Sequence, residues 1–103
     1  FTLQEREAGG PLLDYARKCL READRPSWAA DLESIARFSF DLSTISVPVL
    51  LIAAERDPVS TPEVMAQMAA ALPNARFVLW PGAAHMSPFL YPERLAELLT
   101  LRW

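Results

Sequence analysis

The sequence contains few of the residues that build disulfides and metal sites. Among its 103 residues there are one cysteine, Cys19, and one histidine, His85. A lone cysteine cannot form a disulfide within the chain, and these two residues fall short of the four ligands of a typical structural zinc site. We therefore expect no metal and no cofactor. The near absence of cysteine also favours a reducing, cytoplasmic compartment.

The sequence also lacks a large excess of charge of one sign and lacks long apolar runs. Ten basic residues stand against 13 acidic ones, for a net charge of −3, so there is no basic patch that would bind nucleic acid. No apolar run is long enough for a membrane span, and nothing resembles a signal peptide. Because the chain begins at Phe1 rather than Met, we expect either a processed N-terminus or one piece of something longer.

The first 44 residues indicate helices and loops. Residues 1–10 end in Gly9-Gly10, which predicts a loop and a boundary. Pro11 suits the first turn of a helix that ends before Pro26, and Ser27 is the expected N-cap of the next. The expected buried faces, at helical spacing, are Leu12, Ala16, Cys19 and Leu20, then Trp28, Leu32, Ile35 and Ala36. On this pattern Cys19 is a buried structural thiol.

The remaining residues predict alternating strands and helices. Residues 47–54 and 75–80 are short apolar runs typical of strands in a parallel sheet, with Pro48 at the start of the first. The helix between them begins either at Thr61-Pro62 or at a capping box of Ser60 and Glu63. A last helix closes the chain through residue 103, with Leu95, Leu98 and Leu99 inward. Two strands cannot form a sheet that buries both faces, so we expect further strands from elsewhere.

Two loops follow the carboxyl ends of the predicted strands. One contains Asp57 and the other contains His85. Neighbouring parallel strands place such loops at one edge of the sheet, where ligands bind. There Asp57 would hold one ring nitrogen while the other nitrogen of His85 takes a proton from a nucleophile. The alternatives are that Asp57 only forms a turn before Pro58, that His85 is an ordinary loop residue, or that Glu55 is the acid.

The segments around these loops resemble a known enzyme family. In residues 45–103, "ISVPVLLIAAERDPVSTPE" and "LPNARFVLWPGAAHMSPFLYPERLAELL" are similar to the C-terminal part of an α/β-hydrolase of the esterase or lactonase kind. The resemblance implies an α/β fold in which helices of a cap, residues 1–44, precede the last two parallel strands and their flanking helices. It also implies that Asp57 is the acid and His85 the base of a catalytic triad.

The chain departs from that family in several places. The family often has glycine where Ala54 and Ala84 stand, and its nucleophile lies in a G-x-S-x-G elbow earlier in the chain. The three glycines, Gly9, Gly10 and Gly82, form no such elbow. We therefore expect the nucleophile and the oxyanion hole on an N-terminal half, as a separate chain or a cleaved segment. The substrate would be a small ester, lactone or similar acyl compound.

Other possibilities remain open at this stage. An aspartate nucleophile would give an epoxide hydrolase or haloalkane dehalogenase, and the chain could also be a non-catalytic fragment or assembly module. Met86 and Phe89 flank the histidine and either line the acyl pocket or simply pack. The same choice, between a cap over the substrate and simple helix packing, applies to four aromatic residues of the first half, namely Tyr15, Trp28, Phe38 and Phe40.

Overall fold

The computed structural model describes residues 1–100 of the chain, and its sheet has the predicted parallel pairing. Strand β1 (Val49–Ala54) lies beside strand β2 (Ala75–Trp80), in a register that runs from Val49 opposite Ala75 to Ala54 opposite Trp80. Pro48 stands just before β1, where its missing N–H costs the ladder nothing. Within residues 1–100 no further strand joins this two-stranded sheet.

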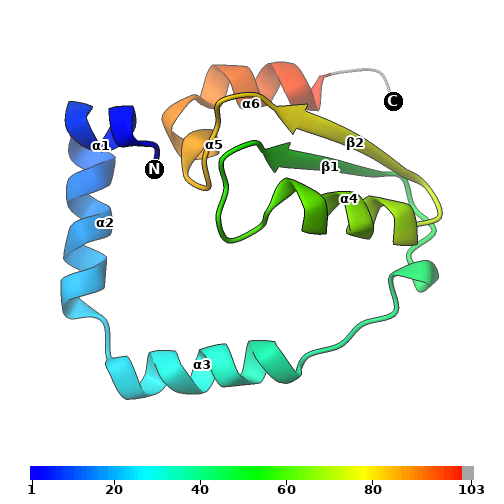
Figure 1. Cartoon of the computed structure of the whole chain (residues 1–103), viewed down its shortest axis with the longest axis horizontal. Coiled ribbons are helices and arrows are strands. Elements are labelled where there is room, and N and C mark those ends of the chain that lie inside the picture. The colour runs from blue at the N-terminus through cyan, green and yellow to red at the C-terminus, as the bar shows by residue number, and fades with distance from the viewer. Residues whose placement is uncertain (101–103) are drawn as a thin grey trace.

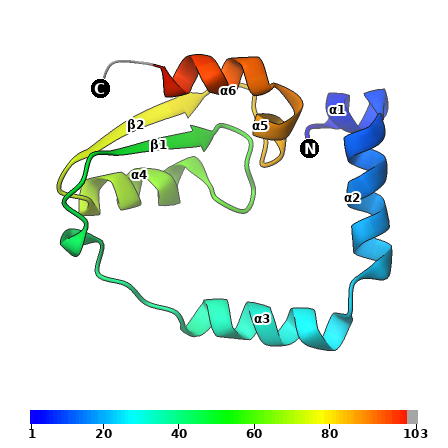
Figure 2. The same cartoon turned by 180° about the vertical axis from the view of Figure 1, so that it is seen from behind.

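Helices cover the two faces of the sheet. Helix α4 (Pro62–Ala71) lies on one face, and helix α6 (Pro92–Leu99) lies on the other (Figures 1 and 2). Thr61 is the N-cap of α4, because its hydroxyl accepts a hydrogen bond from the Val64 N–H at 3.3 Å. This settles the two readings of the helix start in favour of Thr61 and Pro62. A short helix, α5 (Ser87–Leu90), precedes α6.

The main buried cluster lies between the sheet and α6. Trp80, Ala83 and Leu98 are buried there, and four partly buried apolar residues pack against them, namely Ile52, Ala54, Val78 and Leu95. Leu98 and Leu95 thus face inward as predicted. Leu99 does not, since 58% of it is exposed. The predicted continuation of this helix through residues 101–103 lies outside the described residues.

The first part of the chain contains two helical elements that the sequence analysis did not expect, the α-helix α1 and the 3₁₀ helix η1 (Leu42–Thr44). Residues 1–10 are not all loop, because helix α1 (Leu3–Ala8) lies among them. Its start is a capping box. The Thr2 hydroxyl accepts from the Glu5 N–H at 3.1 Å, and the Glu5 carboxylate accepts from the Thr2 N–H at 2.7 Å. These bonds satisfy amides that the first turn of a helix leaves unpaired.

Helices α2 (Pro11–Glu22) and α3 (Arg25–Arg37) form an arm that leads away from the sheet (Figure 1). The N-cap of α3 is Asp24, not Ser27, because the Asp24 carboxylate accepts from the Ser27 N–H at 3.3 Å. Pro26 therefore stands in the first turn of α3, a position that its fixed φ favours.

The predicted buried faces of these two helices are largely exposed. Of the α2 set, Leu12 and Ala16 are half-buried, whereas Leu20 is 62% exposed and Cys19 is an exposed free thiol rather than a buried one. The buried residue of α2 is Leu13, and α3 has none. The Cα radius of gyration of 16.0 Å exceeds the roughly 13 Å of a compact chain of this length. Within residues 1–100, therefore, no segment packs over much of the apolar surface of the arm.

No helix within residues 1–100 has both the length and the apolar character that a membrane crossing needs.

Candidate functional site

Two loops leave the same edge of the sheet, as the parallel register requires. The acid loop follows Ala54 at the end of β1, and the histidine loop follows Trp80 at the end of β2. Backbone hydrogen bonds tie the loops together, from the Glu55 N–H to the Trp80 carbonyl at 3.1 Å and from the Arg56 N–H to the Ala83 carbonyl at 2.8 Å. The pairing of β1 with β2 and these two hydrogen bonds therefore fix the relative position of the two loops.

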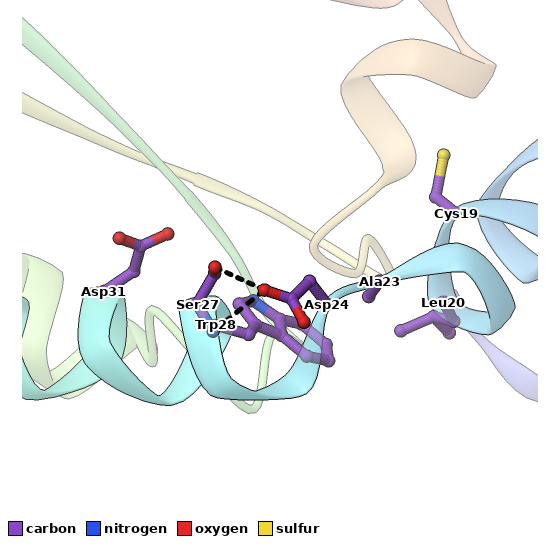
Figure 3. A pocket seen from close by; sticks show the side chains of 7 residues that line it. All are labelled: Cys19, Leu20, Ala23, Asp24, Ser27, Trp28 and Asp31. Atoms are coloured by element: carbon purple, nitrogen blue, oxygen red, sulfur yellow. Dashed lines mark hydrogen bonds between the residues drawn. The ribbon is translucent and has the colours of Figure 1, made fainter.

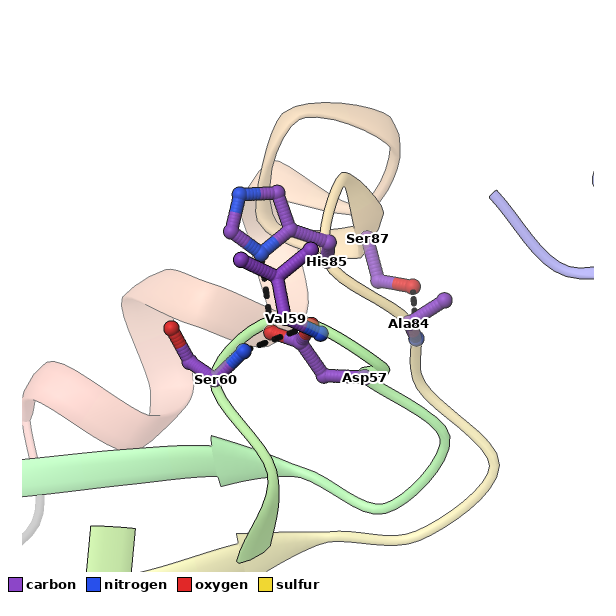
Figure 4. Close-up of polar contacts among 6 residues, drawn as sticks. All are labelled: Asp57, Val59, Ser60, Ala84, His85 and Ser87. Carbon is purple, nitrogen blue, oxygen red and sulfur yellow. Dashed lines mark hydrogen bonds and ion pairs between the residues drawn. The ribbon is translucent and has the colours of Figure 1, made fainter. Parts of the chain in front are cut away.

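The contact between Asp57 and His85 is the centre of the site (Figure 4). Nδ1 of His85 lies 2.8 Å from Oδ2 of Asp57. The other carboxylate oxygen, Oδ1, accepts hydrogen bonds from the Val59 N–H at 2.8 Å and from the Ser60 N–H at 3.1 Å. The Asp57 carboxylate thus has three partners, two backbone N–H groups of its own loop and the imidazole of His85.

The electrostatics of Asp57 favour its ionised form. The side chain of Asp57 is only 7% exposed, whereas that of His85 is 49% exposed. Burial raises the pKa of Asp57, but hydrogen bonds from His85, Val59 and Ser60 outweigh it, and the pKa lies below its ordinary value. At neutral pH the carboxylate accepts the Nδ1 proton of His85. Nε2, which points away from Asp57 in Figure 4, is then free to accept another proton.

Glu55, the alternative acid, has a different partner. Its carboxylate accepts a hydrogen bond from the Gly82 N–H at 2.5 Å, so it joins the two loops instead of contacting His85. Gly82 needs to be glycine because its φ is +71°. Ala54 and Ala84 need not be, since no residue other than glycine has a positive φ within the described part of the chain.

Ser87 and Glu5 support the histidine loop, and the sequence did not point to them. Ser87 is fully buried. Its hydroxyl accepts from the Ala84 N–H at 2.8 Å and donates to Oε1 of Glu5 at 3.0 Å. Because Ala84 directly precedes His85, these bonds hold the backbone from which the imidazole projects. A serine outside an elbow gives no recognisable signal, and its partner lies on the unpredicted helix α1.

A cavity of about 870 Å³ lies beside the imidazole. His85, Met86 and Phe89 line it together with Tyr15 of α2 and Trp28 of α3. The structure thus brings the two candidate substrate-binding residues and two of the four candidate cap aromatics to one place. Phe38 and Phe40 are elsewhere; their rings stack on each other with centroids 6.5 Å apart. All four aromatics are at least 48% exposed, so they do not form buried helix packing.

A second cavity, of about 390 Å³, lies at the corner between α2 and α3 (Figure 3). Asp24 and Asp31 line it, and neither Asp57 nor His85 reaches it. Within residues 1–100, no group of three or more histidine, cysteine, aspartate or glutamate side chains is placed to hold a metal ion. The Asp57–His85 pair, by contrast, has the contact that acid–base chemistry needs.

Comparison with known proteins adds one finding. A family model described as "Alpha/beta hydrolase family" matches residues 2–98, which include both the helical arm and the sheet. Searches of curated proteins and of solved structures gave no significant match.

Proposed function

Because the chain belongs to the alpha/beta hydrolase family, we propose that it supplies the acid and the base of a nucleophile–histidine–acid triad. The reaction is the hydrolysis of an ester, lactone or similar acyl compound. The observation that supports this most directly is the 2.8 Å contact between His85 Nδ1 and Asp57 Oδ2, at the carboxyl edge of parallel strands. A half-exposed imidazole that is held by a buried carboxylate can take the proton of a weakly acidic hydroxyl and so activate it as a nucleophile.

In the proposed mechanism His85 moves the proton and Asp57 keeps the ring in place. Nε2 accepts the proton of the nucleophilic hydroxyl as that oxygen attacks the substrate carbonyl carbon. The resulting imidazolium is stabilised by Asp57 and gives its proton to the leaving alkoxide, so the alcohol departs and an acyl-enzyme remains. Water then attacks the acyl-enzyme while Nε2 takes its proton, and the proton returns to the nucleophile as the acid leaves.

We propose that the nucleophile and the oxyanion hole lie on an N-terminal half outside these residues. No G-x-S-x-G elbow is present in the 103 residues, and the Ser87 hydroxyl is buried and committed to Ala84 and Glu5. Each of the two strands has one edge with no described strand beside it. The backbone N–H and C=O groups along such an edge can form hydrogen bonds with a strand of another segment.

Helices α2 and α3 fit the role of a cap under this proposal. They lie away from the sheet (Figure 2), and their exposed residues Tyr15 and Trp28 line the same cavity as His85. We also propose a cytoplasmic location, which the exposed free thiol of Cys19 supports, since reducing compartments preserve such thiols.

The test is ester hydrolysis by the protein purified through a tag on this chain, with the nucleophile-bearing half present. We expect p-nitrophenyl butyrate to be hydrolysed, and His85→Ala to lower kcat by at least the ~10²–10⁴-fold typical of a lost general base. Phe38→Ala is a suitable control, because Phe38 is exposed and lies away from the cavity. Unchanged turnover in His85→Ala would reject the proposed role.

A further inference from the structure

The position of His85 depends on the hydrogen bonds that hold the loop before it. Two of these bonds come from the acid loop. The Glu55 carboxylate accepts from the Gly82 N–H at 2.5 Å. The Ala83 carbonyl accepts from the Arg56 N–H at 2.8 Å. These two bonds fix the start of the histidine loop relative to the sheet, but neither reaches the residue directly before His85.

The bond at that residue depends on the first half of the chain. The Ala84 N–H donates to the Ser87 hydroxyl at 2.8 Å (Figure 4), and that hydroxyl donates to Oε1 of Glu5 at 3.0 Å. A hydroxyl has a single proton, so once Glu5 accepts that proton, the Ser87 oxygen can only accept at Ala84. Glu5 therefore sets the direction of the hydroxyl, although it lies 82 positions away in the sequence.

Both oxygens of the Glu5 carboxylate are in use. Oε1 accepts from Ser87, and Oε2 accepts from the Thr2 N–H at 2.7 Å. Ser87 is fully buried and Glu5 is partly buried, and hydrogen bonds that a carboxylate accepts are stronger than those between neutral groups. Helix α1 has no buried residue, so apolar packing does not explain its place beside α5. The polar contact between Glu5 and Ser87 explains it.

We propose that Glu5 is a positioning residue for His85 and acts through Ser87. This inference rests on the proposed function, because it takes His85 as the group that receives the proton. Proton transfer to Nε2 needs the imidazole within hydrogen-bond distance of the nucleophile, and a displacement of about 1 Å caused by a remote change can cost about 10²-fold in rate. Glu5 is bonded to Thr2 and Ser87 rather than to His85, so its removal should lower kcat and leave KM unchanged.

The first experiment measures hydrolysis of p-nitrophenyl butyrate by the assembled enzyme with changes in α1 and its N-cap. Glu5→Ala should lower kcat by about tenfold or more and change KM by less than about twofold. Glu7→Ala removes the same charge from an exposed position of the same helix and should change neither. Thr2→Ala removes the N-cap hydroxyl but leaves Ser87 its partner, so it should lower the melting temperature and keep kcat within about twofold. A kcat of Glu5→Ala equal to that of either control would overturn the inference.

The variant Glu5→Gln separates the position of the histidine loop from the stability of α1. An amide has one acceptor oxygen, whereas both Glu5 oxygens face donors. The amide oxygen should face Ser87, because water can replace it at the partly buried Thr2 N–H but not at the fully buried hydroxyl. We expect a lower melting temperature with kcat within about threefold of wild type. A kcat as low as that of Glu5→Ala would contradict the inference.

A double-mutant cycle tests whether Glu5 acts through Ser87. If it does, the removal of Glu5 has no further effect on the histidine loop once Ser87 is replaced by alanine. In the background of Ser87→Ala, the change Glu5→Ala should therefore alter kcat by less than about twofold. A further decrease as large as that in the wild-type background would overturn the route through Ser87.

Amide hydrogen exchange distinguishes this inference from the proposed function, because it does not depend on catalysis. Mass spectrometry of the assembled protein should show exchange of the Ala84 N–H about tenfold faster in Glu5→Ala than in Glu7→Ala, since the loop opens more often. If esters are hydrolysed in a His85-dependent way but these two variants have the same kcat, the proposed function stands and the inference fails. If the wild type hydrolyses no ester, the proposed function fails. Faster exchange in Glu5→Ala would then still support the link from Glu5 to the residue before His85, and equal exchange would reject that link too.

Discussion

Replacing Asp57 by asparagine changes one oxygen into an NH₂ group and tests the proposed geometry closely. Oδ1 of Asp57 accepts from two backbone N–H groups, those of Val59 and Ser60. The amide oxygen of asparagine must take that place, because an NH₂ group there would face two donors. The NH₂ group then takes the place of Oδ2, the Asp57 oxygen that lies 2.8 Å from Nδ1 of His85, and so it faces Nδ1.

The consequence is an imidazole with its proton on the wrong nitrogen. To accept from the NH₂ group, Nδ1 must lose its proton, so the proton moves to Nε2 and that nitrogen can no longer take one from a nucleophile. In serine proteases the equivalent change lowers kcat by about 10⁴-fold, which corresponds to roughly 5.4 kcal/mol of activation free energy. The backbone contacts persist as neutral hydrogen bonds, so we expect a loss of only about 1–3 kcal/mol in the free energy of unfolding.

Two measurements check this prediction. Because the chain has a single histidine, nitrogen-15 NMR reports the tautomer of His85 without overlap, and stopped-flow kinetics on the assembled enzyme report kcat. The control is Asp41→Asn. Asp41 also accepts from the backbone N–H two residues later, that of Ser43 at 3.0 Å, but it has no imidazole partner. Asp57→Asn with the wild-type tautomer, or with kcat within tenfold of wild type, would refute the reasoning.

Three further predictions concern the support of the site. Ser87→Ala removes the hydroxyl that bonds to the buried Ala84 N–H and to Oε1 of Glu5, so urea unfolding should show a decrease of about 1–3 kcal/mol in the free energy of unfolding. The control Ser34→Ala removes an exposed hydroxyl and should decrease it less. Equal decreases in the two variants would contradict a supporting role for Ser87. Gly82→Ala forces alanine to a φ of +71° and should cost about 1–2 kcal/mol in the same assay, whereas an unchanged midpoint would show that the turn relaxes freely. The lowered pKa of Asp57 means that its stabilising contribution is complete above the unfolded-state value of about 3.9 and is lost as pH falls through the lower folded value. Asp57→Asn should therefore weaken the acid dependence of stability, and identical pH profiles would argue against a folded-state interaction.

The sheet and the contact between Asp57 and His85 could be predicted from the sequence because the signals for the two strands are local. The apolar runs that became β1 and β2 are short and bounded by turn residues, and Thr61-Pro62 is a specific start of a helix. Once the two strands are parallel neighbours, Asp57 and His85 must leave the same edge. Their contact across 28 positions of sequence then follows from topology.

The structure of the first half could be predicted only in part. Helical spacing indicates which residues share a face, but it does not say whether anything packs on that face. Cys19 therefore proved exposed although it follows the apolar pattern. Helix α1 was missed because Gly9-Gly10 suggested a loop, while the capping box of Thr2 and Glu5 stands before a segment with little apolar periodicity. The start of α3 was misplaced because Asp24 competes with Ser27 as the N-cap.

The support of the histidine loop could not be predicted because it depends on a long-range contact. Ser87 and Glu5 are 82 positions apart in the sequence, and their hydrogen bond joins α1 to the start of α5. Neither residue type at its position is typical of a site. Only the folded chain places a carboxylate next to a buried hydroxyl.

The location of the nucleophile is the most direct test of the account as a whole. The assembled protein, purified through this chain, is treated with a fluorophosphonate, and the modified residue is identified by mass spectrometry. We predict one stoichiometric adduct on a serine outside these residues, and its loss in His85→Ala. An adduct on any serine within residues 1–103, or an adduct that forms equally well without His85, would contradict the account. Covalent trapping of substrate on an aspartate would instead indicate the epoxide hydrolase or dehalogenase type of chemistry and would reject the serine-type acyl transfer proposed for Asp57 and His85.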